Sequence, residues 1–160
     1  MNIRLITDKD YKAVAEMIAR SVRGDNFANY YPQKSIDDII NNLNEDGVKN
    51  RASWTHFYVI EEDDIIVACG AIGPYWDSLT ESSLFSIFVD DNYKGKGYGR
   101  KIIETLEQDE YFKRAKRIEI PASMSAIPFY RKMGYNHKNG ELTYSDEHFC
   151  LEKFNEECME

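Results

Sequence analysis

The sequence predicts a single α/β (α+β) domain in which helices flank a mixed sheet. Apolar residues recur at helical spacing in some segments and form short runs rich in β-branched residues in others. The acidic turn 61–64 joins two such runs into a predicted antiparallel hairpin. The strand–helix–strand order from Ser83 to Ile120 predicts a parallel pair in the same sheet. We find no internal repeat or linker, so residues 1–160 are expected to form one domain.

The first predicted elements are a strand over residues 3–6 and an amphipathic helix. Thr7, with Asp10 three residues later, resembles the capping box that starts a helix. The helix is predicted to run to about Arg20, because its apolar residues fall on one helical face. These residues are Tyr11, Val14, Met17 and Ile18.

An aromatic loop and a second helix are predicted next. The segment 24–32 mixes three aromatic residues with Gly, Asn and Asp, which is typical of a loop. Ser35 is predicted to cap a helix that ends at Gly47. The apolar face of this helix consists of Ile36, Ile39, Ile40 and Leu43.

The following segments have strand character. Runs 57–60 and 65–72 form the predicted hairpin, and a third strand covers 83–89. A glycine-rich turn over 94–99 then begins a helix. The apolar face of that helix includes Ile102, Ile103 and Leu106.

The last part of the chain is predicted to alternate strand, helix and strand. Residues 117–120 form a strand, and 126–133 form a short helix that ends at Gly134. Two closing strands are predicted at 142–144 and 149–154. The predicted element order is therefore β-α-α-β-β-β-α-β-α-β-β.

Composition and charge exclude several classes of protein. The chain has 160 residues, of which 42% are apolar, enough to form a core. Its formal net charge of −8 opposes binding to nucleic acid, which requires clustered positive charge. No apolar stretch approaches the roughly 20 residues of a membrane-spanning helix, and the N-terminus does not resemble a signal peptide. We therefore expect neither a nucleic-acid nor a membrane partner.

The three cysteines, Cys69, Cys150 and Cys158, show no paired spacing. This spacing argues against a disulfide framework and against a zinc site. No His/Cys cluster has the spacing of metal ligands either. We therefore predict no metal and a reducing, cytoplasmic location. The state of assembly, monomer or homodimer, stays open.

The clearest functional motif lies between a predicted strand and a predicted helix, Lys94-Gly95-Lys96-Gly97-Tyr98-Gly99-Arg100. Glycines allow backbone amides to approach an anion closely. The start of a helix adds unpaired N–H groups and a partial positive charge. Together these features predict a cradle for phosphate or pyrophosphate. Three basic residues reinforce it in an otherwise acidic chain.

Other phosphate-binding motifs fit this turn less well. A P-loop requires Gly-Lys-Ser/Thr at a spacing that the turn lacks. Glycine at every second position also differs from the G-x-G-x-x-G of dinucleotide-binding folds. Two alternatives remain at this point, a flexible turn with solvated lysines and a nucleotide-binding protein that uses the same glycines.

Two segments resemble motifs of the GNAT superfamily of N-acetyltransferases. Residues 87–103 resemble its acetyl-CoA motif, Gln/Arg-x-x-Gly-x-Gly/Ala after a strand, with Lys94 in place of Gln or Arg. Residues 123–135 resemble its segment Asn-x-x-Ala-x-x-Phe/Leu-Tyr-x-x-x-Gly-Phe, with Ser123 in place of Asn. The two segments occur in the expected order, and the element order agrees along nearly the full chain.

The resemblance implies the GNAT fold, a mixed, mostly antiparallel central sheet of about six or seven strands with about four flanking helices. It also implies that an amine attacks acetyl-CoA directly in a ternary complex. The turn 94–100 and Ser123 are then expected to contact the cofactor. A backbone N–H of Phe88 or Val89 is expected to bind the acetyl carbonyl. Tyr130 matches the motif tyrosine and is expected to contact the cofactor and protonate the departing thiolate.

The sequence defines the catalytic base less clearly. Ser83 stands where family members often carry a glutamate. Glu81 lies two residues earlier on the same strand face, so it could deprotonate the amine directly or through water. A solvated strand-end charge is the alternative for Glu81. His56 is a further candidate, although a single histidine before a strand is more often structural.

Aromatic residues in two predicted loops are expected to bind the acceptor. Tyr30 and Tyr31 lie in the first loop beside Phe27, and Tyr75 and Trp76 lie in the second. Ordinary loop anchoring is the alternative for all of them. Such a site suits an amine with an apolar or aromatic body.

The sequence thus predicts an acetyl-CoA-dependent N-acetyltransferase that acts on a small-molecule or peptide amine. The alternative is a non-catalytic acyl-CoA sensor or regulatory module. That module would share the cradle and lack a productive base, and serine at position 83 favours it.

Overall fold

A computed structural model describes residues 1–142, 144–145 and 148–156. The helices are α1 (Tyr11–Arg23), α2 (Asp25–Ala28), α3 (Gln33–Asn42), α4 (Glu45–Trp54), α5 (Tyr98–Leu106), α6 (Glu110–Lys113) and α7 (Ile127–Lys132). The strands are β1 (Asn2–Leu5), β2 (His56–Glu62), β3 (Ile65–Pro74), β4 (Glu81–Val89), β5 (Arg117–Ala122), β6 (Asn136–His137), β7 (Tyr144–Ser145) and β8 (His148–Phe154). Short 3₁₀ turns occur at Asp91–Tyr93, Met124–Ala126 and Lys138–Gly140.

The strands form one mixed sheet in the order β1-β2-β3-β4-β5-β8-β6, and β7 pairs with β8. All pairs are antiparallel except β4 and β5, which run parallel because α5 and α6 connect them. The predicted hairpin and the predicted parallel pair are both confirmed. Within the described residues the sheet has eight strands, and the two-residue strands β6 and β7 are too short to show a sequence pattern.

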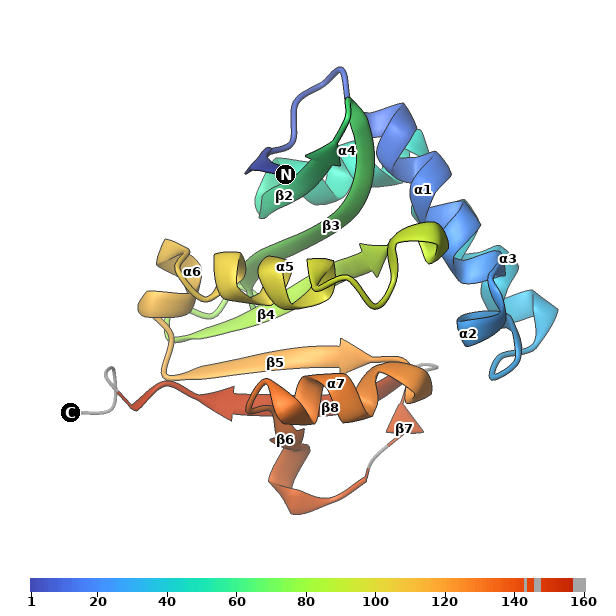
Figure 1. The fold of residues 1–160 in the computed structure, drawn as a ribbon. Coiled ribbons are helices and arrows are strands. Elements are labelled where there is room, and N and C mark those ends of the chain that lie inside the picture. The colour runs from blue at the N-terminus through green and yellow to red at the C-terminus, as the bar shows by residue number, and fades with distance from the viewer. Residues whose placement is uncertain (143, 146–147, 157–160) are drawn as a thin grey trace.

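Helices cover both faces of the sheet, and each face buries its own apolar cluster (Figure 1). α5 and Tyr130 of α7 lie on one face, and α1 and α4 lie on the other. Neighbouring residues of β2 show the strand alternation, since Val59 belongs to one cluster and Ile60 to the other. Both residues are fully buried. The sheet is therefore held between two helical layers.

Strands β4 and β5 separate after a short paired stretch (Figure 1). Their register covers three residue pairs and ends at Ser83 and Glu119. β4 continues to Val89 and β5 to Ala122 without pairing to each other. The backbone groups on the facing edges of these segments are therefore available to a third partner.

A β-bulge lies in the unpaired part of β4. Cys69 of β3 pairs with Phe88, and Ala71 pairs with Phe85, so two residues of β4 stand opposite one residue of β3. Ser86, one of the two, has a left-handed backbone with φ of 53°. The Cys69 thiol donates to the Ser86 carbonyl at 3.2 Å, which stabilises the bulge from the sheet side.

The predicted second helix is wrong in its boundaries. Ser35 does not cap it, because α3 begins at Gln33 after Pro32. Gly47 does not end it either, because α3 stops at Asn42 and a further helix, α4, follows. The Asn44 side chain accepts a hydrogen bond from the Gly47 amide at 2.9 Å. Asn44 therefore caps α4, and Gly47 lies in the first turn of that helix.

Three smaller differences concern capping and loops. The aromatic loop 24–32 contains the short helix α2, and 110–113 forms α6, which the sequence did not predict. α1 begins at Tyr11 and extends to Arg23, and its N-cap is Asp10 rather than Thr7. The predicted closing strand 142–144 includes Thr143, which lies outside the described residues, as does Cys158.

The Asp10 carboxylate joins β1 to the start of α1. Arg4 Nη1 lies 2.6 Å from Asp10 Oδ2, and Arg4 Nη2 lies 3.0 Å from Oδ1. The Thr7 amide and hydroxyl also donate to Oδ2, at 2.7 and 3.0 Å. These hydrogen bonds, first of all those from Arg4, lower the pKa of Asp10 to about 2.

Asp10→Asn is expected to lower the free energy of unfolding by about 1 kcal/mol at pH 7, since Arg4 is partly open to solvent. A depressed pKa means that ionised Asp10 stabilises the fold above its unfolded pKa of about 3.9. That contribution is lost as the pH falls toward 2. Urea unfolding between pH 2 and pH 7 should show a steeper acid loss in the wild type than in the variant. An equal loss of unfolding free energy with falling pH in both proteins would contradict this prediction. Asp8→Asn, at an exposed position, is the control and should follow the wild type.

Candidate active site

A cavity of about 940 Å³ opens where β4 and β5 separate. Its floor consists of β4 from Leu84 to Val89 and β5 from Ile120 to Ala122. The start of α5 and the face of α7 form one side, and side chains from α1 to α4 form the other. The cavity is thus lined by segments from most of the chain.

The glycine-rich turn forms one end of this cavity. Gly95 and Gly97 have left-handed φ values of 76° and 88°, and a Cβ at either would meet no atom within 4 Å. Gly97 is the N-cap of the nine-residue helix α5, whose first amides point out of the helix end. Gly99 has a different role, because a Cβ there would lie 3.3 Å from the Phe129 ring of α7. The turn is therefore open on the side that an anion would approach.

The charged residues of the turn differ in their positions. Lys94 lines the cavity and pairs with Asp91 at 2.7 Å. Arg100 also lines the cavity and is exposed. Lys96 lies over the Tyr93 ring at 5.3 Å and is not part of the wall.

Tyr98 is buried and anchors the turn to the sheet. Its hydroxyl donates to Glu62 of β2, which raises the pKa of Tyr98 to about 12. The Tyr98 side chain also belongs to the apolar cluster under α5. Of this residue, only the backbone at the helix start is placed to meet an anion.

α1 fixes the end of β4 beside the turn. The Ser21 hydroxyl donates to the Val89 carbonyl at 3.1 Å, and Ser21 lines the cavity. Arg20 donates to the buried Asp90 carboxylate at 2.9 Å. The sequence shows no motif for these contacts, because they join residues that are about 70 positions apart.

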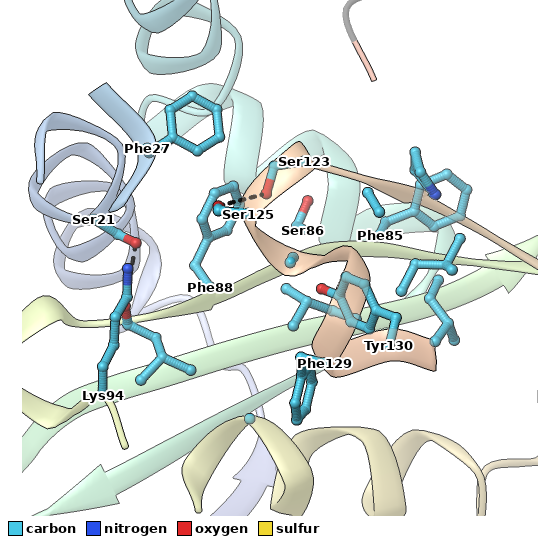
Figure 2. A pocket seen from close by; sticks show the side chains of 18 of the residues that line it. Ser21, Phe27, Phe85, Ser86, Phe88, Lys94, Ser123, Ser125, Phe129 and Tyr130 are labelled. Atoms are coloured by element: carbon cyan, nitrogen blue, oxygen red, sulfur yellow. Dashed lines mark hydrogen bonds between the residues drawn. The ribbon is translucent and has the colours of Figure 1, made fainter. Parts of the chain in front are cut away.

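Tyr130 places a hydroxyl inside the cavity. Its side chain is 5% exposed, and Figure 2 shows the hydroxyl directed toward the space between Ser86 and Phe129. Burial raises the pKa of Tyr130 well above its usual value. The hydroxyl is therefore protonated at neutral pH and can donate a proton or a hydrogen bond.

The segment before α7 closes the cavity from above. Ser123 and Ser125 both line it, with their hydroxyl oxygens 3.4 Å apart (Figure 2). The Met124 amide donates to the Tyr31 hydroxyl oxygen at 3.1 Å. Tyr31 stacks on Phe27 with ring centroids 4.5 Å apart. This contact joins the early aromatic loop to the segment expected to bind the cofactor.

The predicted residues Phe88 and Glu81 lie toward opposite ends of β4. Phe88 lines the cavity with its ring (Figure 2), whereas its backbone pairs with Cys69 of β3. Glu81 lies outside the cavity, at the far end of β4. Its carboxylate pairs with Arg117 at 3.0 Å, because the parallel register places these two residues side by side. The position of Glu81 therefore does not support a role as the base.

The predicted acceptor residues are divided between two places. Tyr31 lines the cavity, but Tyr30 is 55% exposed and does not. Tyr75 and Trp76 lie in the loop between β3 and β4, which is the end of β4 opposite the glycine turn. The Tyr75 ring covers Arg117 at 5.4 Å, and Trp76 is 87% exposed. Neither residue lines the cavity.

Sequence reasoning missed several cavity residues of α3 and α4. Asp38 lines the cavity and pairs with exposed Lys34 at 2.9 Å. Asn42, four residues later, lies on the same helical face. Arg51 of α4 lines the cavity as well. The helical spacing of Asp38 and Asn42 was a usable signal, whereas Arg51 was hidden because α4 was not predicted.

His56 does not line the cavity. Its Nδ1 lies 2.8 Å from Asp109 Oδ2, and the Tyr58 hydroxyl donates to the same carboxylate at 2.6 Å. Asp109 also caps α6 through the Tyr111 amide. This network joins β2 to α6 and gives His56 a structural position.

Within the described residues, no group of three or more His, Cys, Asp or Glu side chains is arranged to hold a metal ion. No helix in the described part of the chain is both long and apolar enough to cross a membrane.

Comparison with protein families gives one match. Residues 53–137 match a family model described as an acetyltransferase (GNAT) domain. This segment contains β4, the glycine turn, β5 and α7, and ends at β6. No curated protein matches the chain in sequence.

Solved structures are similar over nearly the whole chain. The paia N-acetyltransferase of Thermoplasma acidophilum, in complex with coenzyme A, has a TM-score of 0.81 at 15% identity, covering 96% of this chain and 98% of that one. A GCN5-related N-acetyltransferase of Rhodopseudomonas palustris has a TM-score of 0.77 at 17% identity, covering 96% and 95%. The ribosomal-protein-alanine N-acetyltransferase of Brucella melitensis has a TM-score of 0.64 at 18% identity, covering 97% and 100%. At these identities the likeness shows a shared fold, and the fold predicted from the motifs is confirmed.

Proposed function

The chain belongs to the GNAT acetyltransferase family, and from this membership we propose that it moves the acetyl group of acetyl-CoA to a primary amine of a small molecule or peptide. Both substrates bind together, and residues 1–160 act as one domain. The observation that carries the proposal is the cavity between β4 and β5, with an anion cradle at one end and the Tyr130 hydroxyl inside it.

The cradle fits the pyrophosphate of acetyl-CoA. Gly95 and Gly97 leave open space above the turn, and the first amides of α5 point into that space. Lys94 and Arg100 stand on the cavity wall beside it and supply positive charge. The Thermoplasma acidophilum neighbour is a coenzyme A complex, which supports the same cosubstrate here.

The unpaired edge of β4 supplies donors for the rest of the cosubstrate. The Asp90 amide donates to the Val67 carbonyl of β3, so by strand alternation the Val89 amide points to the other side, away from β3. Phe88 pairs with Cys69, whereas Ile87 lies in the bulge, where regular pairing with β3 is interrupted. We therefore assign the acetyl carbonyl contact to Ile87 or Val89 in preference to Phe88.

Acetyl transfer requires one C–N bond to form and one C–S bond to break. The neutral amine attacks the acetyl carbonyl carbon, and the departing thiolate takes a proton. Tyr130 is assigned as the donor of that proton, because its buried hydroxyl faces the cavity and stays protonated. The proton that the nitrogen loses as it becomes an amide restores the proton donor. Acetyl-CoA supplies the activated thioester, and the protein supplies position, donors and exclusion of water.

The amine must lose a proton before it attacks. Among the described residues that line the cavity, Asp38 is the one with a carboxylate. Its ion-pair partner Lys34 is exposed to solvent, so this pair is weak. We assign Asp38 to attract the ammonium group and to accept its proton through water. Glu81, held by Arg117 outside the cavity, has no access to it.

The experiment that tests the proposal measures cosubstrate binding and turnover separately. Calorimetry should show saturable acetyl-CoA binding, and a thiol-release assay over amino acids, peptides, polyamines and aminoglycosides should identify an acceptor. Absence of saturable acetyl-CoA binding would contradict the proposal. Binding without turnover on any amine would favour the acyl-CoA sensor, which the position of Glu81 also favours.

A further inference from the structure

Arg51 holds its guanidinium in the cavity wall against two aromatic rings that also contact each other. The guanidinium carbon lies 4.6 Å from the centroid of Phe85 and 5.4 Å from that of Trp54. Nη1 donates to the Ser86 hydroxyl at 3.3 Å. These contacts orient the planar group and leave most of its N–H donors without a protein acceptor among the described residues.

Within the described part of the chain, Arg51 is a half-buried cavity cation without a carboxylate partner, whereas Arg100 and Lys132, which also line the cavity, are exposed to solvent. Arg20 pairs with Asp90, and Lys94 pairs with Asp91. Among the described residues, no carboxylate lies within 4.0 Å of the Arg51 guanidinium. Acidic residues outnumber basic ones in the chain, 28 to 20. Burial without an anion lowers the pKa of Arg51, and an anionic ligand would remove that cost.

The position of Arg51 assigns this anion to the acceptor. Figure 2 shows Phe85 on the opposite side of the cavity from Lys94, with Ser86 between them. The pyrophosphate cradle is at the Lys94 side, so it does not reach Arg51. The Ile87 amide, proposed to bind the acetyl carbonyl, is two residues from Phe85 across the bulge, so the chain places them at most about 7 Å apart. An anion on Arg51 would therefore lie close to the attacking amine.

We propose that Arg51 binds a carboxylate of the acceptor and that the acceptor is a small amino carboxylate, such as a free amino acid, rather than a polyamine. This inference rests on the proposed function and specifies its substrate class. The guanidinium fork matches a carboxylate with two parallel hydrogen bonds. In an α-amino acid the amine and the carboxylate are close enough to meet the reaction centre and Arg51 together. Phe27 and Tyr31 line the same cavity and offer stacked aromatic rings to an apolar side chain.

The first test compares matched acceptors that differ only in the carboxylate. The full chain is assayed for thiol release with L-phenylalanine and phenethylamine, L-leucine and isoamylamine, and spermidine. The wild type should show a kcat/KM at least about 10-fold higher for the amino acids. Arg51→Gln should lower kcat/KM for the amino acids by about 10- to 100-fold and change it for the amines by less than about 3-fold. Equal wild-type rates on each pair, or equal losses on both members of a pair, would overturn the inference.

Two further variants separate binding from folding. Arg51→Lys keeps the charge and loses the fork, so an intermediate loss for the amino acids is expected. Arg131→Gln removes the same charge from an exposed residue of α7 outside the cavity, and no change is expected. The acetyl-CoA Kd should stay the same in all three variants, because the cradle is at the other side of the cavity.

A binding measurement keeps the inference testable even if no acceptor is turned over. In the presence of CoA, the wild type should bind N-acetyl-L-phenylalanine more tightly than N-acetylphenethylamine, by at least about 10-fold. Arg51→Gln should abolish that difference. If no acceptor is turned over but N-acetyl-L-phenylalanine still binds more tightly, the proposed function is wrong and the carboxylate site stands. Turnover of amines with no such difference would keep the function and remove the site.

Discussion

Gly97→Val is expected to abolish acetyl-CoA binding, with Kd raised at least about 100-fold. Gly97 has φ of 88° and lies at the N-cap of α5. Space is available there, since a Cβ would meet no atom within 4 Å, so the effect arises from the backbone. A β-branched residue disfavours the left-handed region by about 1–3 kcal/mol. The turn then changes conformation, and its amides leave the positions that meet the pyrophosphate, each charged hydrogen bond contributing about 1.5–3 kcal/mol.

Gly140→Val is the matched control for this prediction. Gly140 also has a left-handed φ, of 73°, with no atom within 4 Å of a Cβ, and it does not line the cavity. Both variants should lose a similar free energy of unfolding, whereas only Gly97→Val should lose binding. Calorimetry and thermal unfolding measure the two effects separately. Retained acetyl-CoA affinity in Gly97→Val would show that the turn is not the cradle.

Tyr130→Phe is expected to lower kcat by about 100- to 10,000-fold, the range for loss of a general acid. The ring and its apolar contacts remain, so KM for acetyl-CoA should change by only a few fold. Because burial raises the pKa of Tyr130 above that of ordinary tyrosine, this hydroxyl should not limit the rate on the alkaline side up to pH 10. Steady-state kinetics across pH on wild type and variant measure both points.

Tyr135→Phe controls for removal of a buried tyrosine hydroxyl. Tyr135 is fully buried, and its hydroxyl donates to Glu107 Oε2 at 3.0 Å outside the cavity. This variant should lose about 1 kcal/mol of stability and keep its kcat. If Tyr130→Phe keeps its kcat as well, the thiolate takes its proton from another source, and the role assigned to Tyr130 is wrong.

The sequence was sufficient where the signal is local. The hairpin β2–β3, the parallel pair around α5 and the glycine turn were all predicted, because strand runs, turn residues and helix starts lie close together in sequence. The fold followed from their order and from two family motifs. The second helix failed for a local reason too, since Gly47 resembles a helix end but lies in the first turn of α4 behind the Asn44 cap.

The site was less predictable, because it depends on which end of each strand faces which helix. Glu81 shares a strand with the cavity floor, but the parallel register places it beside Arg117 at the closed end. Tyr75 and Trp76 belong to a loop at that same end. Asp38 and Arg51 reach the cavity only through the packing of α3 and α4, which no short motif encodes.

The cavity draws its two sides from different stretches of the chain, and this arrangement bears on how specificity could be exchanged between related enzymes. The cavity side chains from α2 to α4 come from residues 27–51, before the segment 53–137 that matches the family. The cradle and Tyr130 lie inside that segment. Recombination at Thr55, between α4 and β2, would therefore transfer one wall to a new partner sequence. The new sequence would have to keep the Arg20–Asp90 and Ser21–Val89 contacts that hold the end of β4.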